Sequence, residues 1–254
     1  MCANYIPVTS QDRLLSFFGV DKPVGRDAPA VDVYPLGTAP FIRLAEAGSG
    51  HRVLEAGMFG LLPGFAKELA FGRKTYNARS ETVDRLASFR TAWARGQRCI
   101  VPVEAIFEYC HETGSAQRWC IAQPLSRPFG IGGLYSVWTA PDGTRTFSFT
   151  MVTVNADGHP VFGRMHPPGD EKRMPLILDP ADHDRWLGGS PEEARSLFRP
   201  FMGPLECWPM AAPGRTPRAA APRAPRRAAP APRPAPPPDS PAAGPQDDPQ
   251  APLF

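Results

Sequence analysis

The first 210 residues form a succession of short apolar runs interrupted by glycine and proline. Several runs alternate apolar and polar residues, and others are continuous and rich in Val, Ile and Phe, as buried strands are. We expect strands at residues 41–44, 53–61, 98–108, 119–122, 129–137, 147–155 and 176–178. Helices are expected at residues 10–18, 83–94, 180–187 and 191–198, the last two with proline in the first turn. The pattern predicts an α+β fold, a single domain with a mainly antiparallel, barrel-like β-sheet and a few flanking helices.

From residue 211 onward the composition changes to alanine, proline and arginine, with almost no large apolar residues. Such a segment cannot offset the entropy lost on ordering, so we expect residues 211–254 to be a disordered tail behind a domain of residues 2–210. The tail carries six arginines and three aspartates, which leaves 22 basic and 22 acidic residues in the domain. Net charge therefore gives no support for nucleic-acid binding. The arginines of the tail can attract DNA at low salt, but a solvated linker is the simpler interpretation.

Five cysteines are spread along the chain without a C-x-x-C pair, so neither a zinc ribbon nor a thiol redox motif is indicated. Their odd number also argues against a complete disulfide framework. The N-terminal segment lacks the basic and apolar regions of a signal peptide, and no apolar run reaches the length of about 18 residues that a transmembrane helix needs. We expect a monomer in the reducing cytoplasm, without a metal or cofactor.

Cys2 follows the initial methionine, and a small second side chain is the usual condition for removal of that methionine. Its removal would give Cys2 a free α-amine beside its thiol. Because an α-amine has a pKa of roughly 8, a useful fraction is neutral at pH 7 and can attack an aldehyde to form an imine. The thiol can then close a five-membered thiazolidine ring, which an internal cysteine cannot do. Position alone favours an incidental cysteine, so other residues must decide.

Four further residues carry chemistry in segments with simpler interpretations. Asn77 and Arg79 lie in TYNARSETV, where a polar turn before a helix is the alternative. Glu108 ends the run RCIVPVEAIFE and precedes a tyrosine, and a carboxylate in such a strand usually faces solvent or pairs with an arginine. His166 lies in RMHPPGDEKRMPLIL, a loop of a kind that is usually at the surface. None of the four decides the function alone.

Taken in order, these segments resemble the SRAP family (SOS response-associated peptidase). The matching elements are MC at the start, FGLLPGFA, NARSET, RCIVPVEAIFEY, SFTMVT and H…RMPLIL, and they cover residues 2–210. The resemblance implies a DNA-repair protein of the SOS response. Family members form a thiazolidine crosslink with abasic sites in single-stranded DNA and remove their own first methionine. Peptidase and abasic-site lyase activities are implied in the same way.

The resemblance also implies roles for single residues. Cys2 matches the crosslinking cysteine, and Asn77 matches the asparagine of N-A-R-S-E-T. Glu108 matches the glutamate of the family's F-E-[WY] strand, and His166 matches the histidine before R-M-P. Three positions match residues that contact DNA: Arg79, Phe65 and Thr153.

Three features depart from the family pattern. The chain begins MCAN where MCGR is commoner, and Phe65 replaces a tryptophan, which removes an indole N–H. The segment PPGDEK separates His166 from Arg173, although a longer H-x-P-G-D-E-K-R-M form resembles one branch of the family. If His166 is not the family histidine, His159 is its rival.

The residue types fit the expected chemistry. A raised pKa would let Glu108 move the proton that opens the closed sugar of an abasic site. His166 titrates in the right range to be a second proton carrier, and Asn77 can hold the Cys2 amine. Arg79 would bind a phosphate, and Phe65 would stack on an unpaired base.

Two other functions stay open at this point. Cys2 can instead be the nucleophile of an N-terminal-nucleophile thiol peptidase or amidohydrolase, with its α-amine as the base. The chain can also be a non-enzymatic sensor of single strands that its basic tail tethers to DNA. Arg79 and Phe65 favour the crosslinker, because a peptidase needs neither a phosphate contact nor a base contact.

Overall fold

The computed structural model describes residues 2–20, 32–46 and 48–210, all of which belong to one compact unit. Its strands are β1 (Asn4–Pro7), β2 (Thr38–Leu44), β3 (Arg52–Phe59), β4 (Asn77–Arg79), β5 (Arg98–Cys110), β6 (Gln117–Ala122), β7 (Phe129–Thr139), β8 (Arg145–Asn155), β9 (Arg173–Pro175), β10 (Ile177–Leu178) and β11 (Glu206–Pro209). Its α-helices are α1 (Gln11–Phe18), α2 (Arg90–Ala94), α3 (His183–Gly188) and α4 (Pro191–Arg195). Short 3₁₀ helices are η1 (Leu69–Lys74), η2 (Pro124–Ser126), η3 (Phe162–Arg164) and η4 (Pro180–Asp182). The predicted tail lies outside the described residues.

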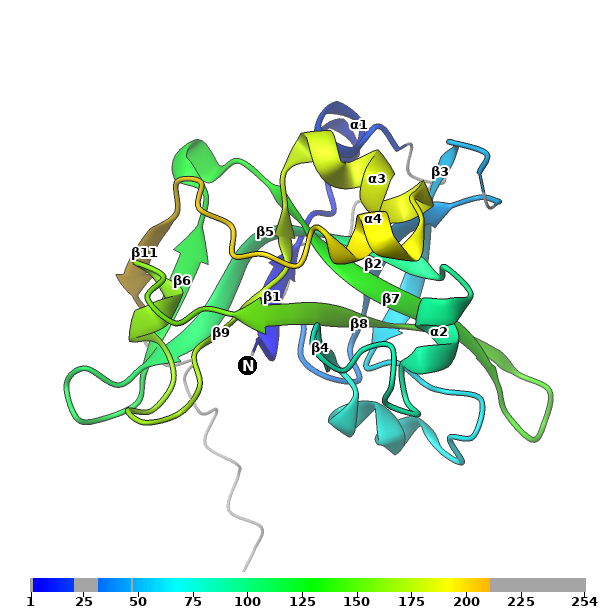
Figure 1. Cartoon of the computed structure of the whole chain (residues 1–254), viewed down its shortest axis with the longest axis horizontal. Helices are drawn as coiled ribbons and strands as arrows, with labels where there is room; N and C mark the ends of the chain where they lie inside the picture. The colour runs from blue at the N-terminus through cyan, green and yellow to red at the C-terminus, as the bar shows by residue number, and fades with distance from the viewer. Residues whose placement is uncertain (1, 21–31, 47, 211–254) are drawn as a thin grey trace, which may run out of the picture. The chain divides into compact units, whose positions relative to one another are not determined.

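Five of the described strands close into a barrel (Figure 1). The ring runs from β5 to β7, β8, β3 and β2 and returns to β5. Every pairing in the ring is antiparallel except that of β3 with β8, which are parallel. The remaining strands extend the same sheet: β1 and β6 pair with β5, β4 and β9 with β8, β10 with β7, and β11 with β6. The expected mainly antiparallel, barrel-like α+β fold is therefore confirmed.

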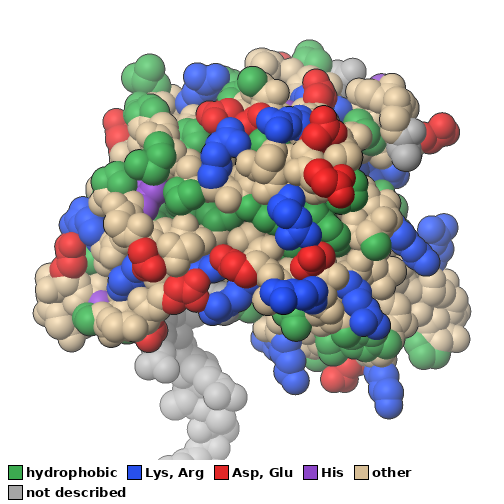
Figure 2. Space-filling model, viewed as in Figure 1, with side chains coloured by type: hydrophobic (Ala, Val, Ile, Leu, Met, Phe, Trp, Pro, Cys, Tyr) green, Lys and Arg blue, Asp and Glu red, His purple; other side chains and the backbone are tan. Residues whose placement is uncertain are grey.

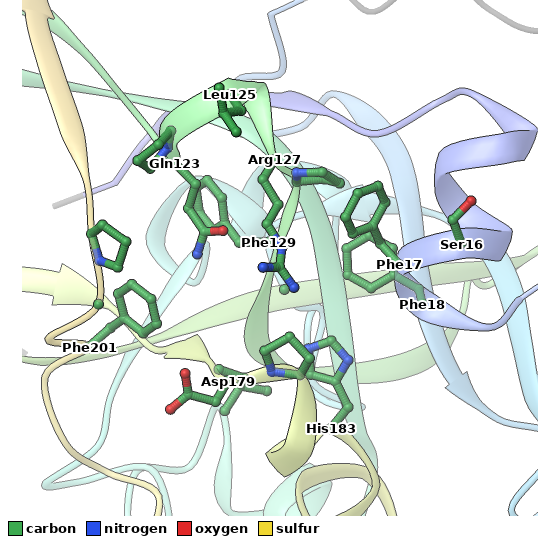
Figure 3. Close-up of a pocket in the computed structure, with 17 residues that line it drawn as sticks. Ser16, Phe17, Phe18, Gln123, Leu125, Arg127, Phe129, Asp179, His183 and Phe201 are labelled. Carbon is green, nitrogen blue, oxygen red and sulfur yellow. The ribbon is translucent and has the colours of Figure 1, made fainter.

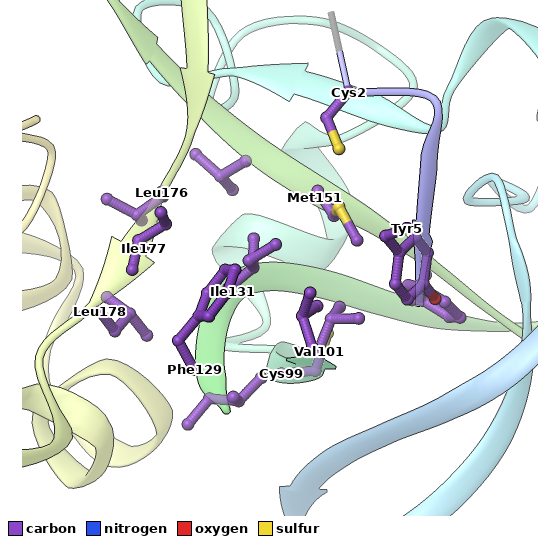
Figure 4. Close-up of a cluster of buried hydrophobic side chains, with 14 of the residues drawn as sticks. Cys2, Tyr5, Cys99, Val101, Phe129, Ile131, Met151, Leu176, Ile177 and Leu178 are labelled. Carbon is purple, nitrogen blue, oxygen red and sulfur yellow. The ribbon is translucent and has the colours of Figure 1, made fainter. Parts of the chain in front are cut away.

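Aromatic side chains from several strands pack together in the core. The Phe59 ring stacks on Phe149 with ring centres 5.5 Å apart, and Tyr5 meets Phe59 edge-on at 5.4 Å. Met151 and Cys2 belong to the same buried cluster, and Figure 4 shows the Cys2 sulfur at one end of it. The start of the chain is therefore part of the hydrophobic core, and β1 fixes the position of Cys2.

Helix α3 lies against the barrel because β7 has a glycine at the contact. A Cβ atom at Gly132 would lie 2.9 Å from Leu176 Cδ2 and 3.1 Å from Trp186 Cε2. Without that Cβ, the fully buried Trp186 approaches β7 and donates its indole N–H to the Cys99 carbonyl at 2.8 Å. Helices α1, α3 and α4 stand together at the top of Figure 1. The glycines that interrupt this strand in the sequence thus make room for a helix.

All seven expected strands are present, with ends shifted by up to three residues. The expected helix at 83–94 is wrong over its first part, because residues 83–89 form successive turns and only Arg90–Ala94 is α-helical. The helix at 180–187 is divided into η4 and α3, and the helix at 191–198 ends at Arg195. Strands β1, β4, β9 and β11 were not expected, since three or four residues are too few to show a period.

Candidate functional site

Cys2 lies two residues before the start of β1, and its side chain is buried, with 1% of its surface exposed. Its thiol donates a weak hydrogen bond to the Asn4 carbonyl at 3.9 Å. Burial raises the pKa of the Cys2 thiol well above its usual value, and the negative charge of Glu108 raises it further. The thiol is therefore protonated at neutral pH, within electrostatic reach of Glu108.

Glu108 lies near the end of β5 and is buried, with 4% of its surface exposed. Its register partner in β6 is Trp119, and the preceding residue, Phe107, pairs with Asn4 of β1. Burial raises the pKa of Glu108 from 4.5 to about 7. The prediction of a carboxyl group with a raised pKa is therefore confirmed, and both of its protonation states are populated at neutral pH.

His166 faces Glu108 although 58 positions separate them in the sequence. Its Nε2 lies 3.6 Å from Glu108 Oε2, and its backbone N–H donates to the Tyr109 carbonyl at 2.8 Å. Burial, together with the positive charge of Lys172, lowers the pKa of His166 from 6.5 to about 4. The expectation that His166 titrates near neutral pH is therefore wrong, since desolvation keeps its imidazole neutral.

Asn77 begins β4 and pairs in register with Met151 of β8, which shares the apolar cluster of Cys2. Its Nδ2 donates to the Tyr76 carbonyl at 3.0 Å. Its Oδ1 is buried and has no hydrogen-bond partner among the residues that the structure describes. Burial raises the pKa of the Tyr76 phenol, and Glu108 and Cys2 raise it further, which places Tyr76 in the same group. The sequence argument missed Tyr76, whose only signal was its position before NARSET.

The three expected DNA contacts differ in exposure. The Arg79 side chain is half exposed and forms an ion pair with Glu171 at 2.7 Å. Phe65 is 55% exposed and meets Phe71 edge-on, with ring centres 5.6 Å apart. Thr153 is fully buried, and its hydroxyl accepts a hydrogen bond from Arg173 at 3.2 Å. The Thr153 side chain therefore does not reach the surface and lies behind Arg79, its register partner in β4.

His159 has a different environment from His166. It is buried, and its Nδ1 accepts the backbone N–H groups of Val161 and Phe162, each at 3.1 Å. Its Nε2 lies 2.8 Å from the Phe201 carbonyl. Both ring nitrogens therefore hold backbone groups, and His166 is the histidine that accompanies Glu108.

The unusual start MCAN places a buried asparagine behind Cys2. The Asn4 side chain donates to the Val33 carbonyl at 3.2 Å and accepts from Arg118 Nη2 at 2.6 Å. The Arg118 guanidinium also lies 3.5 Å from the centre of the Phe107 ring and pairs with Asp32 at 2.5 Å. In this chain a guanidinium from β6 therefore anchors the residue behind Cys2.

Charges of both signs are interleaved on the face shown in Figure 2, which agrees with the neutral composition of the domain. A cavity of about 450 Å³ opens beside Phe17, Arg127 and His183 (Figure 3), and none of the seven predicted site residues lines it. Within the described ranges, no group of three or more His, Cys, Asp or Glu side chains could hold a metal ion. No helix in this part of the chain is long and apolar enough to cross a membrane.

The site defines a β-barrel protein that groups a cysteine at the start of the chain with a buried carboxyl group and a neutral histidine. The family described as SOS response associated peptidase (SRAP) matches residues 1–212, and the chain belongs to this family. The resemblance found in the sequence is therefore confirmed.

Curated relatives and solved structures agree with this assignment. Abasic site processing protein YoqW of Bacillus subtilis (strain 168) is 28% identical over 209 residues, which cover 79% of this chain and 88% of YoqW. Abasic site processing protein HMCES of Xenopus tropicalis is 29% identical over 181 residues, which cover 61% of this chain and 52% of HMCES. A crystal structure of a Bordetella bronchiseptica protein is 32% identical with a TM-score of 0.75, covering 83% of this chain and 100% of that chain. A Bacteroides thetaiotaomicron protein of known structure, 22% identical with a TM-score of 0.71, has the same fold over 83% of this chain and 92% of its own.

Proposed function

We propose that this chain captures abasic sites in single-stranded DNA through Cys2 after removal of Met1, and that it acts in the response to DNA damage. The observation that carries the proposal is the grouping of buried Cys2 and Glu108 with partly buried His166, in which a Glu108 oxygen lies 3.6 Å from the His166 imidazole. The names of the relatives, which are abasic site processing proteins, support the substrate class.

The reaction begins at the amine of Cys2. The neutral amine adds to the aldehyde carbon of the opened sugar, and the resulting carbinolamine loses water to give an imine. The thiol sulfur then adds to the imine carbon, and the thiol proton passes to the nitrogen as the thiazolidine closes. With a pKa of about 7, Glu108 can give a proton to the departing water and take one from the thiol.

Asn77 can position the Cys2 amine, and His166 can accept a proton from the sugar. The Asn77 Oδ1 atom has no partner among the described residues, so it is available to accept a hydrogen bond from the Cys2 amine. The neutral His166 imidazole can accept the hydroxyl proton of the closed sugar as the ring opens. Each proton that must move therefore has a nearby acceptor.

A thiol peptidase would require Cys2 as a thiolate before bond formation. Burial and the charge of Glu108 raise the pKa of the thiol, so the thiolate is scarce at pH 7. The crosslinking route needs only a neutral amine at its first step. The environment of Cys2 therefore favours the crosslinker over the peptidase.

The exposed residues suit an unpaired strand. Arg79 can bind a phosphate without distinguishing bases, and Phe65 offers an exposed ring on which a base can stack. Crosslinking should therefore be efficient on single strands and poor within a continuous duplex, where pairing encloses the lesion.

The test combines intact mass with a crosslinking assay. The purified protein should lack one methionine, and it should form a slowly migrating band with an abasic single-stranded oligonucleotide on a denaturing gel. Cys2→Ser should keep the amine but form only an imine, which borohydride traps, whereas the control Cys207→Ser should crosslink normally. Retention of Met1 in protein that still crosslinks, or an unchanged band for Cys2→Ser, would refute the aminothiol mechanism.

A further inference from the structure

Arg79 is engaged by a carboxylate at the position where the proposed function requires a phosphate. Glu171 Oε2 lies 2.7 Å from Arg79 Nη1, and both side chains are partly exposed. The other oxygen of Glu171 accepts from Arg173 at 2.6 Å. Arg173 is almost fully buried and is held independently by Glu81 at 2.9 and 3.0 Å. Arg173 therefore holds one carboxylate oxygen of Glu171 while the other oxygen pairs with Arg79.

Glu171 belongs to the segment 167–172, which separates His166 from the RMP strand. The segment turns at Gly169, whose φ is +85°, and the Asp170 N–H donates to the Pro167 carbonyl at 3.2 Å. The Lys172 backbone N–H donates to Asp157 at 3.2 Å, which fixes the end of the turn. The extra residues therefore form a supported turn that delivers one carboxylate to Arg79.

We infer that Glu171 stands in for a DNA phosphate on Arg79 and thereby sets how tightly this chain binds single strands, an inference that rests on the proposed function. Carboxylates and phosphates bind the same donors of a guanidinium group, so the two cannot both pair fully with Arg79. Each DNA strand that binds must first displace Glu171 from the Arg79 guanidinium. An exposed ion pair is weak enough to exchange, so Glu171 lowers affinity without blocking the site.

The size of the effect follows from the strength of exposed pairs. Ion pairs of this kind are worth about 0.2–1 kcal/mol, which corresponds to an affinity change of about 1.5- to 5-fold. Glu171→Gln keeps an acceptor for Arg173 and removes the charge that competes for Arg79. We expect this variant to bind an undamaged single-stranded oligonucleotide about 2- to 5-fold more tightly in fluorescence anisotropy at low salt.

Asp170→Asn is the matched control, since it removes the same charge from the neighbouring position without a contact to Arg79. We expect it to change the affinity less than about 1.5-fold. In an Arg79→Ala background, the gain in DNA affinity from Glu171→Gln should disappear, because the guanidinium for which Glu171 competes is absent. Thermal unfolding of each variant checks that the barrel is intact.

Three results would overturn the inference: an unchanged affinity for Glu171→Gln, an equal gain for Asp170→Asn, or a gain that persists without Arg79. The proposed function fails separately. If the wild-type protein neither binds single strands nor crosslinks to abasic sites, the function is wrong, whereas normal crosslinking with no effect of Glu171→Gln rejects the role of Glu171 alone.

Discussion

Glu108 and His166 should give the protein two opposite dependences of stability on pH. The pKa of Glu108 is raised from 4.5 to about 7, and that of His166 is lowered from 6.5 to about 4. Each difference of about 2.5 corresponds to about 3 kcal/mol of folding free energy. Glu108→Gln and His166→Asn should separate the two contributions, and asparagine tolerates the positive φ of +66° at position 166.

The signs follow from which state holds the proton. Between pH 4.5 and 7, Glu108 is ionised in the unfolded chain and protonated in the folded one, so it lowers stability as pH rises. Between pH 6.5 and 4, His166 is protonated in the unfolded chain and neutral in the folded one, so it lowers stability as pH falls. In the wild type the two opposite slopes nearly cancel between pH 4.5 and 6.5, so the summed cost of the two shifts is almost constant there.

Urea denaturation at several pH values between 4 and 7.5 measures the contributions of both residues to the free energy of unfolding. Relative to the wild type, Glu108→Gln should gain about 3 kcal/mol as pH rises from 4.5 to 7. His166→Asn should gain a similar amount as pH falls from 6.5 to 4. The control Glu68→Gln changes an exposed side chain and shows what the same substitution does outside the buried site. A flat difference curve for Glu108→Gln would show that its carboxyl group is not held protonated by burial.

Three further variants test the supports of the site and barrel. Arg118→Met keeps the apolar stem but removes the donor to Asn4, and should lower the free energy of unfolding by about 2 kcal/mol in urea. His159→Ala should lower stability by a similar amount without slowing crosslinking by the folded protein. Gly60→Ala should cost about 3 kcal/mol, since φ is +129° and the new Cβ would lie 2.4 Å from the Gly72 carbonyl oxygen. An unfolding midpoint equal to that of the wild type would contradict each of these predictions.

The long strands could be predicted because their apolar runs are long enough to show a pattern. β5 buries almost every residue and β8 buries the continuous run 148–154, as strands covered on both faces do, and both were expected. β4 and β9 are three residues long and exist only because β8 offers them an edge. Their formation depends on tertiary pairing, which local sequence does not encode. The turns at residues 83–89 likewise replaced a helix that local propensity favoured.

The site was predictable where a residue's own strand determines its environment. The aromatic strand around Glu108 allowed a raised pKa, although solvent exposure or an arginine partner was the simpler interpretation of a carboxylate there. The partnership with His166 depends on an isolated bridge between Cys110 and Met165, which joins distant segments and leaves no periodic signal. The burial of Thr153 was not foreseen because β8 is covered on both faces here, so that Val152, Thr153 and Val154 are all buried and alternation does not bring any of them to the surface.

The environments of the cysteines indicate how Cys2 is selected for reaction. All five cysteines are free thiols, and burial raises the pKa of Cys99 and Cys207 as well as that of Cys2. Burial also raises the pKa of Cys120, to about 11. An activated thiolate therefore does not distinguish Cys2 from Cys99, Cys120 and Cys207. What distinguishes it is the α-amine that the proposed removal of Met1 exposes, beside a carboxyl group that is half protonated at neutral pH. In the proposed mechanism, selectivity thus resides in the amine and its proton carriers, and the thiol acts only after the imine has formed.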